Sequence, residues 1–170
     1  LRRSAIHDNE GLGVDVTGRT VTLESSVVAR NGGVGVRATG TTVKLRFASL
    51  IGNDAAGGPN DTLNLECVGT TMGSAEGSLV LEPRGVSILC GNEAFFLDRT
   101  LTDDEIAGRY RELDELFSDV ARGTLREPET SPIAELGLVP WELRDPYFDL
   151  DGEPRPRVDR PLVFPGADEP

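Results

Sequence analysis

The sequence predicts an all-β solenoid, specifically a right-handed parallel β-helix with about 22 residues per coil. Three observations predict this fold. Residues 3–24 and 25–46 align without a gap, short stretches within each unit alternate between apolar and polar residues, and Gly, Asn or Thr separates the stretches. A fixed period of this length is typical of solenoids, in which each unit buries its apolar face against the next unit.

The two units are identical at 10 of their 22 aligned positions. The identical pairs are Ser4/Ser26, Asn9/Asn31, Gly11/Gly33, Gly13/Gly35, Val14/Val36, Thr17/Thr39, Gly18/Gly40, Thr20/Thr42, Val21/Val43 and Leu23/Leu45. Residues 12–16 and 20–24 alternate with a period of two, which is the pattern of a strand with one buried face. The Leu-x-x-Leu-x-Leu pattern of leucine-rich repeats is missing. We therefore expect three short strands per coil, with coils stacked at about 4.8 Å.

Asparagine recurs at the same place in successive coils. Asn9, Asn31 and Asn53 are each separated by 22 residues. Stacking would place them directly above one another at a turn, where Asn tolerates a left-handed backbone and side-chain amides can hydrogen-bond along the stack. The spacing therefore predicts an asparagine ladder.

Charged residues also follow the period, with opposite signs one coil apart. The predicted pairs are Asp8 with Arg30, Asp15 with Arg37, and Glu24 with Arg46. Such residues on a solenoid wall could instead form a saccharide-binding or lyase site. The complementary signs at one fixed spacing favour inter-coil ion pairs, each contributing about 0–1 kcal/mol at the surface.

The histidine and cysteine content limits metal chemistry. His7 is the single histidine and lies beside a predicted turn, so we interpret it as a solvated turn residue and expect no histidine-based metal site. Cys67 and Cys90 are 23 residues apart, about one coil, which would bring their Cα atoms within disulfide range. A disulfide is the preferred interpretation, and two buried free thiols are the alternative. No Cys/His cluster has the spacing of a zinc site.

Coils are expected to continue less regularly through residues 62–67, 78–81 and 86–90, so that 1–98 form the solenoid. Residues 57–61 interrupt the period and are typical of a loop. Asn60 and Asp61 in that loop offer oxygen ligands for calcium, although a plain turn explains them as well. We therefore expect no cofactor, with Ca²⁺ as the alternative.

After the coils the period changes to a helical one. Thr102 and Glu105 have the spacing of a capping box, which predicts a helix over about 102–122. The residues with apolar helical spacing are Ile106, Tyr110, Leu113, Phe117 and Val120. We expect residues 99–123 to pack on the solenoid or cap it. The many acids of this segment are interpreted as its solvated face rather than as metal ligands.

The tail, residues 124–170, holds 9 of the 11 prolines and is expected to be extended and packed on the solenoid. Trp141, Tyr147 and Phe148 are its predicted anchors; a sugar-binding platform is the alternative. The net charge of −12 is uneven, because residues 1–92 carry 9 acids and 8 bases while residues 93–170 carry 20 acids and 9 bases. No basic patch with interleaved aromatics is present, which argues against nucleic acid as a partner.

Three phrases in the tail follow a recognisable order. They are Ser-Pro-Ile-Ala-Glu-Leu-Gly at 131–137, Asp-Leu-Asp-Gly-Glu-Pro-Arg-Pro at 149–156 and Gly-Ala-Asp-Glu at 166–169. They resemble the "SPAIDAG", "D-x-DG-x-PRP" and "DIGAYE" segments of bacterial right-handed parallel β-helix surface proteins of the pectate-lyase-like superfamily. With the Asn-x-Gly-x-Gly-Val coils, the resemblance covers roughly two thirds of the chain. The predicted helix and Phe164-Pro165, in place of Asp-Ile, depart from the pattern.

The resemblance implies an extracellular or cell-surface location, and a fold that serves lyases, epimerases, hydrolases, adhesins and structural walls. We expect the C-terminal region of a longer β-helix protein, continuous with upstream coils. We expect it to act as a non-catalytic scaffold for adhesion or assembly, with other subunits or surface polysaccharide as partners. The alternative is the C-terminal part of a carbohydrate-active enzyme, for which Lys44, Arg46 and Arg37 are the residues to suspect and Trp141 a further saccharide contact. No catalytic residue is assigned, and no transmembrane segment is evident.

Overall fold

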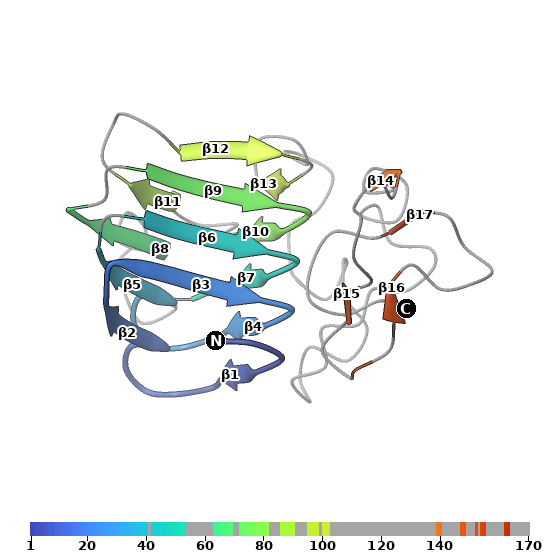
Figure 1. Ribbon diagram of the computed structural model, residues 1–170. Helices are drawn as coiled ribbons and strands as arrows, with labels where there is room; N and C mark the ends of the chain where they lie inside the picture. The colour runs from blue at the N-terminus through green and yellow to red at the C-terminus, as the bar shows by residue number, and fades with distance from the viewer. Residues whose placement is uncertain are drawn as a thin grey trace.

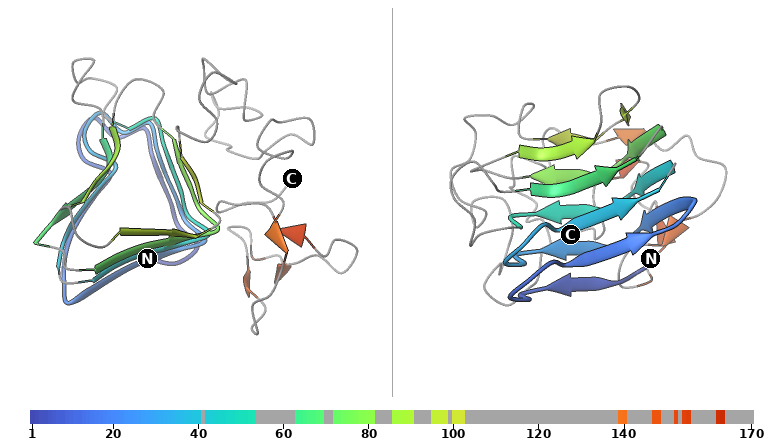
Figure 2. Two further views of the ribbon diagram at one scale, coloured as in Figure 1. Left: turned by 90° about the horizontal axis from the view of Figure 1, so that it is seen from above. Right: turned by 90° about the vertical axis from the view of Figure 1, so that its left-hand side faces the viewer.

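The computed structural model describes residues 1–40, 42–53, 63–69, 72–81, 86–90, 95–98 and 100–102, and in the C-terminal region 139–140, 147–148, 152, 154–155 and 162–163. The described part of residues 1–102 is a parallel β-solenoid, as the sequence predicts (Figure 1). Viewed along its axis, the stack of coils has a triangular outline with one sheet on each side (Figure 2).

Each coil contributes three strands. The first has β1 (Ala5–His7), β2 (Val14–Thr17) and β3 (Thr20–Glu24), and the second has β4 (Val27–Ala29), β5 (Val36–Thr39) and β6 (Thr42–Arg46). The third has β7 (Ser49–Ile51), β8 (Leu63–Val68) and β9 (Met72–Glu76), and the fourth has β10 (Leu79–Leu81), β11 (Val86–Cys90) and β12 (Phe95–Asp98). Strand β13 (Leu101–Thr102) follows, so coil strands continue past the predicted boundary at residue 98.

The strands form three parallel sheets, each named here after its first strand. The β1 sheet has the order β1-β4-β7-β10-β13, the β2 sheet has β2-β5-β8-β11, and the β3 sheet has β3-β6-β9-β12. Ala5 pairs with Val27 and Thr20 with Thr42, both 22 residues on, so the sequence alignment of the two units is the observed register. Between the second and third coils the offset grows to 30, as for Thr42 with Met72.

Inward-facing apolar residues of the three sheets form one core along the axis. Its buried members are Val21, Leu23, Val28, Val36, Ala38, Val43, Leu45, Ala48, Leu50, Leu65, Ala75 and Val80. They occupy every second position of the strands, because successive side chains of a strand point to opposite faces. Like residues align vertically, such as Leu23 with Leu45, and Phe95 of the fourth coil packs against the same core.

Two corners of the triangle repeat a left-handed backbone conformation from coil to coil. At the corner between the β3 and β1 sheets, φ is 44° at Arg3, 45° at Ser25, 47° at Phe47 and 54° at Gly77. Non-glycine residues rarely adopt positive φ, and each costs about 1–3 kcal/mol that the surrounding structure must offset. The repetition shows that stacking, rather than residue type, imposes the turn.

The C-terminal region contains two short antiparallel ladders. Strand β14 (Val139–Pro140) pairs with β17 (Leu162–Val163), and β15 (Tyr147–Phe148) pairs with β16 (Pro154–Arg155). The predicted helix beyond Thr102, the anchor Trp141 and the loop residues Asn60 and Asp61 lie outside the described residues. The predicted extents of the helical and tail segments stay predictions.

Candidate functional site

The predicted asparagine ladder is present at one corner of the solenoid. Asn9 donates from Nδ2 to Oδ1 of Asn31 at 2.8 Å, and Asn31 donates to Oδ1 of Asn53 at 2.8 Å. The backbone N–H groups of the same residues donate to the same acceptors at 3.2 Å. Asn31 and Asn53 are fully buried, so these bonds satisfy amides that water does not reach.

Asn64 is a fourth rung that the period does not predict. Its Oδ1 accepts from Nδ2 of Asn53 at 2.6 Å, and its Nδ2 donates to the carbonyl oxygen of Leu81 at 2.8 Å. Asn64 is only 11 residues beyond Asn53, because it belongs to the next strand of the same, longer coil. The signal available in the sequence was a single Asn between two leucines, where a strand would bury it.

Hydroxyl side chains also recur along the corner between the β3 and β1 sheets, except in the third coil, where Ala48 stands in their place. The backbone N–H of Ser4 donates to Oγ of Ser26 at 3.3 Å, and that of Ser78 donates to Oγ1 of Thr100 at 3.3 Å. Each upper hydroxyl donates in turn to a carbonyl two residues earlier, as Ser26 does to Glu24 at 2.8 Å. The identity of Ser4 and Ser26 in the aligned repeat is the sequence feature from which these hydroxyl contacts could have been predicted, and they were not predicted.

The Asp8–Arg30 pair is present as predicted. Arg30 Nε donates to Asp8 Oδ1 at 2.9 Å, and Arg30 Nη2 also donates to Asp8 Oδ2. His7 Nδ1 lies 2.7 Å from the same carboxylate. The hydrogen bond from Arg30, and after it that from His7, lowers the pKa of Asp8 below the ordinary value of 3.8. His7 is exposed, in agreement with its interpretation as a solvated residue.

Glu24 and Arg46 also pair, within a longer column of alternating charge. Arg2 Nε lies 3.3 Å from Glu24, Arg46 Nη1 lies 3.7 Å from Glu24, and Arg46 Nε lies 3.4 Å from Glu76. Arg46 is thus held between carboxylates of the coils below and above it. Its guanidinium is engaged in structural contacts on both sides.

Arg37 has a different principal partner from the predicted one. Its Nε donates to Glu66 Oε2 at 2.6 Å, and this hydrogen bond raises the pKa of Arg37. Glu66 is the register neighbour on the coil above, where its longer side chain reaches the guanidinium. Asp15, the register neighbour below, acts on Arg37 only as a nearby charge.

Lys44 is the suspected residue that retains an accessible charge. It is exposed on the outward face of the β3 sheet, in one row with Thr22, Ser74 and Phe96 of neighbouring coils. Among the described residues no carboxylate forms an ion pair with it. The described part of the chain also contains no group of three or more His, Cys, Asp or Glu side chains that could hold a metal ion.

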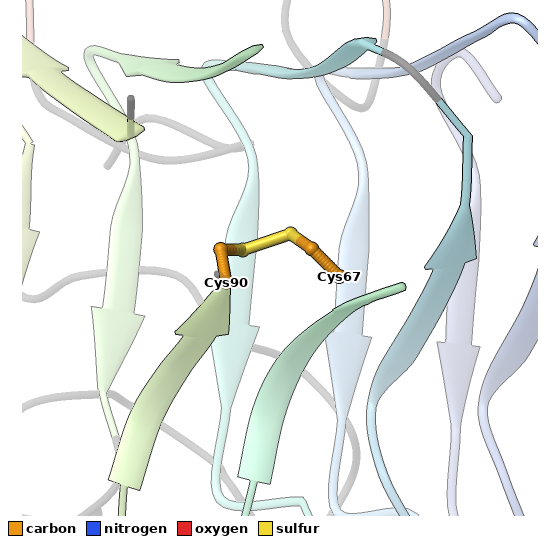
Figure 3. Close-up of a disulfide and its surroundings, with 2 residues drawn as sticks. All are labelled: Cys67 and Cys90. Carbon is orange, nitrogen blue, oxygen red and sulfur yellow. A yellow bond between two sulfur atoms is a disulfide. The ribbon is translucent and has the colours of Figure 1, made fainter. Parts of the chain in front are cut away.

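Cys67 and Cys90 form a disulfide between successive coils (Figure 3). They are register partners in β8 and β11, with their Cα atoms 4.5 Å apart. Both side chains lie on the inward face and pack against the core, in the row that Ala38 occupies one coil below. The preferred sequence interpretation is therefore confirmed, and the alternative of free thiols is excluded.

These features define the class as a disulfide-linked parallel β-solenoid whose polar corners are closed by side-chain ladders. Comparison with protein-family models, with curated proteins and with solved structures gives no significant match to this chain. Within the described residues, no helix has the length and apolar character needed to cross a lipid bilayer.

Proposed function

We propose that this chain is the C-terminal region of a secreted or cell-surface right-handed parallel β-helix that acts as a non-catalytic scaffold for adhesion or assembly. One observation carries the proposal. The polar side chains that most resembled a site bind one another from coil to coil: the asparagines in their ladder, Asp8 with Arg30, and Arg46 between two glutamates. Groups held in this way stabilise stacking and are not available to a substrate.

The disulfide supports the extracellular part of the proposal. Disulfides persist in oxidising compartments and are rare in the reducing cytosol. The Cys67–Cys90 bond joins two coils that are already in register, so it reinforces a wall rather than forming a reactive centre. The acidic C-terminal half, with 20 acids and 9 bases in residues 93–170, favours a basic partner or divalent cations as the ligand of such a scaffold.

The alternative is the C-terminal part of a carbohydrate-active enzyme with its catalytic coils mainly upstream. The exposure of Lys44 favours it, because an exposed ammonium on a parallel sheet is able to contact an acidic polysaccharide. The other suspected cations, Arg37 and Arg46, each form an ion pair with a glutamate. Among the residues that the structure describes, no carboxylate cluster lies beside Lys44, so this basic residue has the charge to bind an anion but not a neighbouring site for the calcium that lyases of the resembled family hold.

Incubation with a panel of acidic polysaccharides separates the two functions. The scaffold proposal expects retention on some polysaccharides or on cell-surface fractions, and no release of unsaturated oligosaccharides by ultraviolet absorbance. The matched variants are Lys44→Ala and Thr22→Ala, one coil apart in the same row. Product release by the unaltered chain that disappears in Lys44→Ala and persists in Thr22→Ala would establish the enzyme instead.

A further inference from the structure

Of the four asparagines in the ladder that the structure describes, Asn31 alone precedes a glycine. Asn31 is followed by Gly32, whereas the other three precede Glu, Asp and Leu. An asparagine amide is lost when the backbone nitrogen of the next residue attacks the side-chain carbonyl carbon. A glycine leaves that nitrogen unhindered, because it has no Cβ and adopts more backbone conformations than other residues. By its sequence, Asn31 is therefore the ladder residue most prone to deamidation.

Stacking explains why a glycine follows Asn31. A Cβ placed on Gly32 would collide with the backbone carbonyl oxygen of Glu10 on the coil below. A backbone atom of a stacked coil moves only if the register shifts, so a larger residue does not fit here. The fold therefore retains the labile dipeptide, and the survival of the amide depends on the groups that surround it.

The ladder holds the groups that the reaction would use. The attacking nitrogen, that of Gly32, donates its hydrogen to the backbone carbonyl oxygen of Asn9 at 2.7 Å. The leaving nitrogen, Nδ2 of Asn31, donates to Asn53 Oδ1 at 2.8 Å and to the carbonyl oxygen of Ile6 at 3.3 Å. Oδ1 of Asn31 accepts from the backbone N–H and from Nδ2 of Asn9, which fixes the plane of the side chain. The exposed fraction of Asn31 is 0%, so water and base do not reach it.

We propose that Asn31 is a latent modification site, which the intact ladder keeps unreactive and which opening of the ladder exposes to deamidation. In the opened chain, the nitrogen of Gly32 loses its proton to hydroxide and forms a bond to Cγ of Asn31. The bond from Cγ to Nδ2 breaks, and the leaving nitrogen takes a proton from water to depart as ammonia. The resulting five-membered succinimide adds one water molecule and opens to aspartate or to isoaspartate. Water and base are the only other reactants.

Either product makes the opening irreversible. An aspartate at position 31 has no Nδ2 donor, so its carboxylate would face Oδ1 of Asn53 and the carbonyl oxygen of Ile6, and a buried charge without a partner is costly. An isoaspartate lengthens the backbone by one methylene and shifts the corner out of register. The site thus converts a transient opening of the coil into a permanent loss of stacking. This inference goes beyond the scaffold proposal and does not depend on it.

Peptide mass spectrometry tests the protection in the full chain. Asn31 begins the tryptic peptide 31–37, so its deamidation is read from the mass of that peptide. In mildly alkaline buffer we expect the reaction to be at least about a hundredfold slower in the native protein than in guanidinium chloride, because local opening must precede it. Asn9, in peptide 4–19 and followed by Glu10, is the internal control and should react much more slowly than Asn31 in the denatured chain. Equal rates for Asn31 in the two states, or for Asn31 and Asn9 in the denatured chain, would overturn the proposal.

Two variants separate the ladder from global stability. Asn53→Ala removes the acceptor of both N–H groups of Asn31, whereas Leu45→Ala truncates a fully buried core side chain of the second coil and leaves the ladder contacts in place. Both variants lower the free energy of unfolding, so they are compared under conditions of equal folded fraction. We expect Asn31 to deamidate at least about tenfold faster in Asn53→Ala, because two of its hydrogen bonds are lost. Equal rates would show that global unfolding alone exposes Asn31 and would refute the role of the ladder.

Discussion

Replacing Asn53 by alanine is the sharpest test of the asparagine ladder. The Asn53 side chain makes four hydrogen bonds, all buried. Its Oδ1 accepts from the backbone N–H of Asn31 at 3.2 Å and from Nδ2 of Asn31 at 2.8 Å. Its Nδ2 donates to the carbonyl oxygen of Val28 at 2.9 Å and to Oδ1 of Asn64 at 2.6 Å. Alanine removes all four and leaves the buried N–H of Asn31 without its acceptor.

At about 1 kcal/mol for each hydrogen bond, the loss in the free energy of unfolding is about 4 kcal/mol. Asn9 provides the matched control, because it is the exposed lowest rung and donates from its side chain to Asn31 alone. Water replaces that contact, so Asn9→Ala should cost less than about 1 kcal/mol.

Urea denaturation followed by circular dichroism measures both variants. We expect the transition midpoint to fall strongly for Asn53→Ala and little for Asn9→Ala, with similar slopes for the two transitions. Equal losses at the two positions would refute the reasoning, since the rank order follows from burial and the number of hydrogen bonds alone. A loss below about 1 kcal/mol at Asn53 would show that the ladder is structurally incidental.

Three further predictions concern other features. The Cys67–Cys90 disulfide joins residues 23 positions apart, so its reduction should lower the free energy of unfolding by about 3 kcal/mol. Urea titration with and without reductant measures the loss, and an unchanged midpoint would contradict the prediction. Gly77→Ala should destabilise more than Gly69→Ala, because both have positive φ but only the Gly77 Cβ would meet another side chain, that of Phe47, at 2.6 Å; thermal melts that shift equally for both would show that the clash relaxes. The pKa of Asp8 is lowered in the folded state, so its contribution, below about 1 kcal/mol at this exposed pair, is present above the ordinary carboxyl pKa of 3.8 and disappears as the pH falls through the lowered value. Asp8→Asn should therefore lower stability at neutral pH and leave it unchanged at strongly acidic pH, and a constant difference across the range would refute the linkage.

The repeat was sufficient to predict the register of the first two coils, since a period of 22 places Asn9 under Asn31 and Glu24 under Arg46. The third coil was harder, because residues added between β7 and β8 change the offset to about 30. Asn64 enters the ladder only after that change, and Glu66 reaches Arg37 from the same longer coil. Local periodicity carries no information on such partners once the offset changes.

The burial of both faces of strands β4, β7 and β10 could not be predicted from strand patterns, for a different reason. Short continuous apolar runs such as Val27-Val28-Ala29 are compatible with burial on one face or on both. Val27, Val28 and Ala29 are all buried, and the alternation within a strand carries no information on what covers its second face. For the candidate site, the sequence correctly predicted that Arg46 pairs with Glu24, which argues against a catalytic role for Arg46.

The change of offset between the second and third coils has a consequence for how such a protein tolerates alteration. Thr42 meets Met72 thirty residues on, yet the next coil returns to 22, with Gly73 beside Phe95. The columns of the stack continue through the longer coil without loss of alignment. The segment between β7 and β8 is therefore a natural insertion point, where a peptide tag or a grafted loop is expected to be displayed while the wall behind it keeps its architecture.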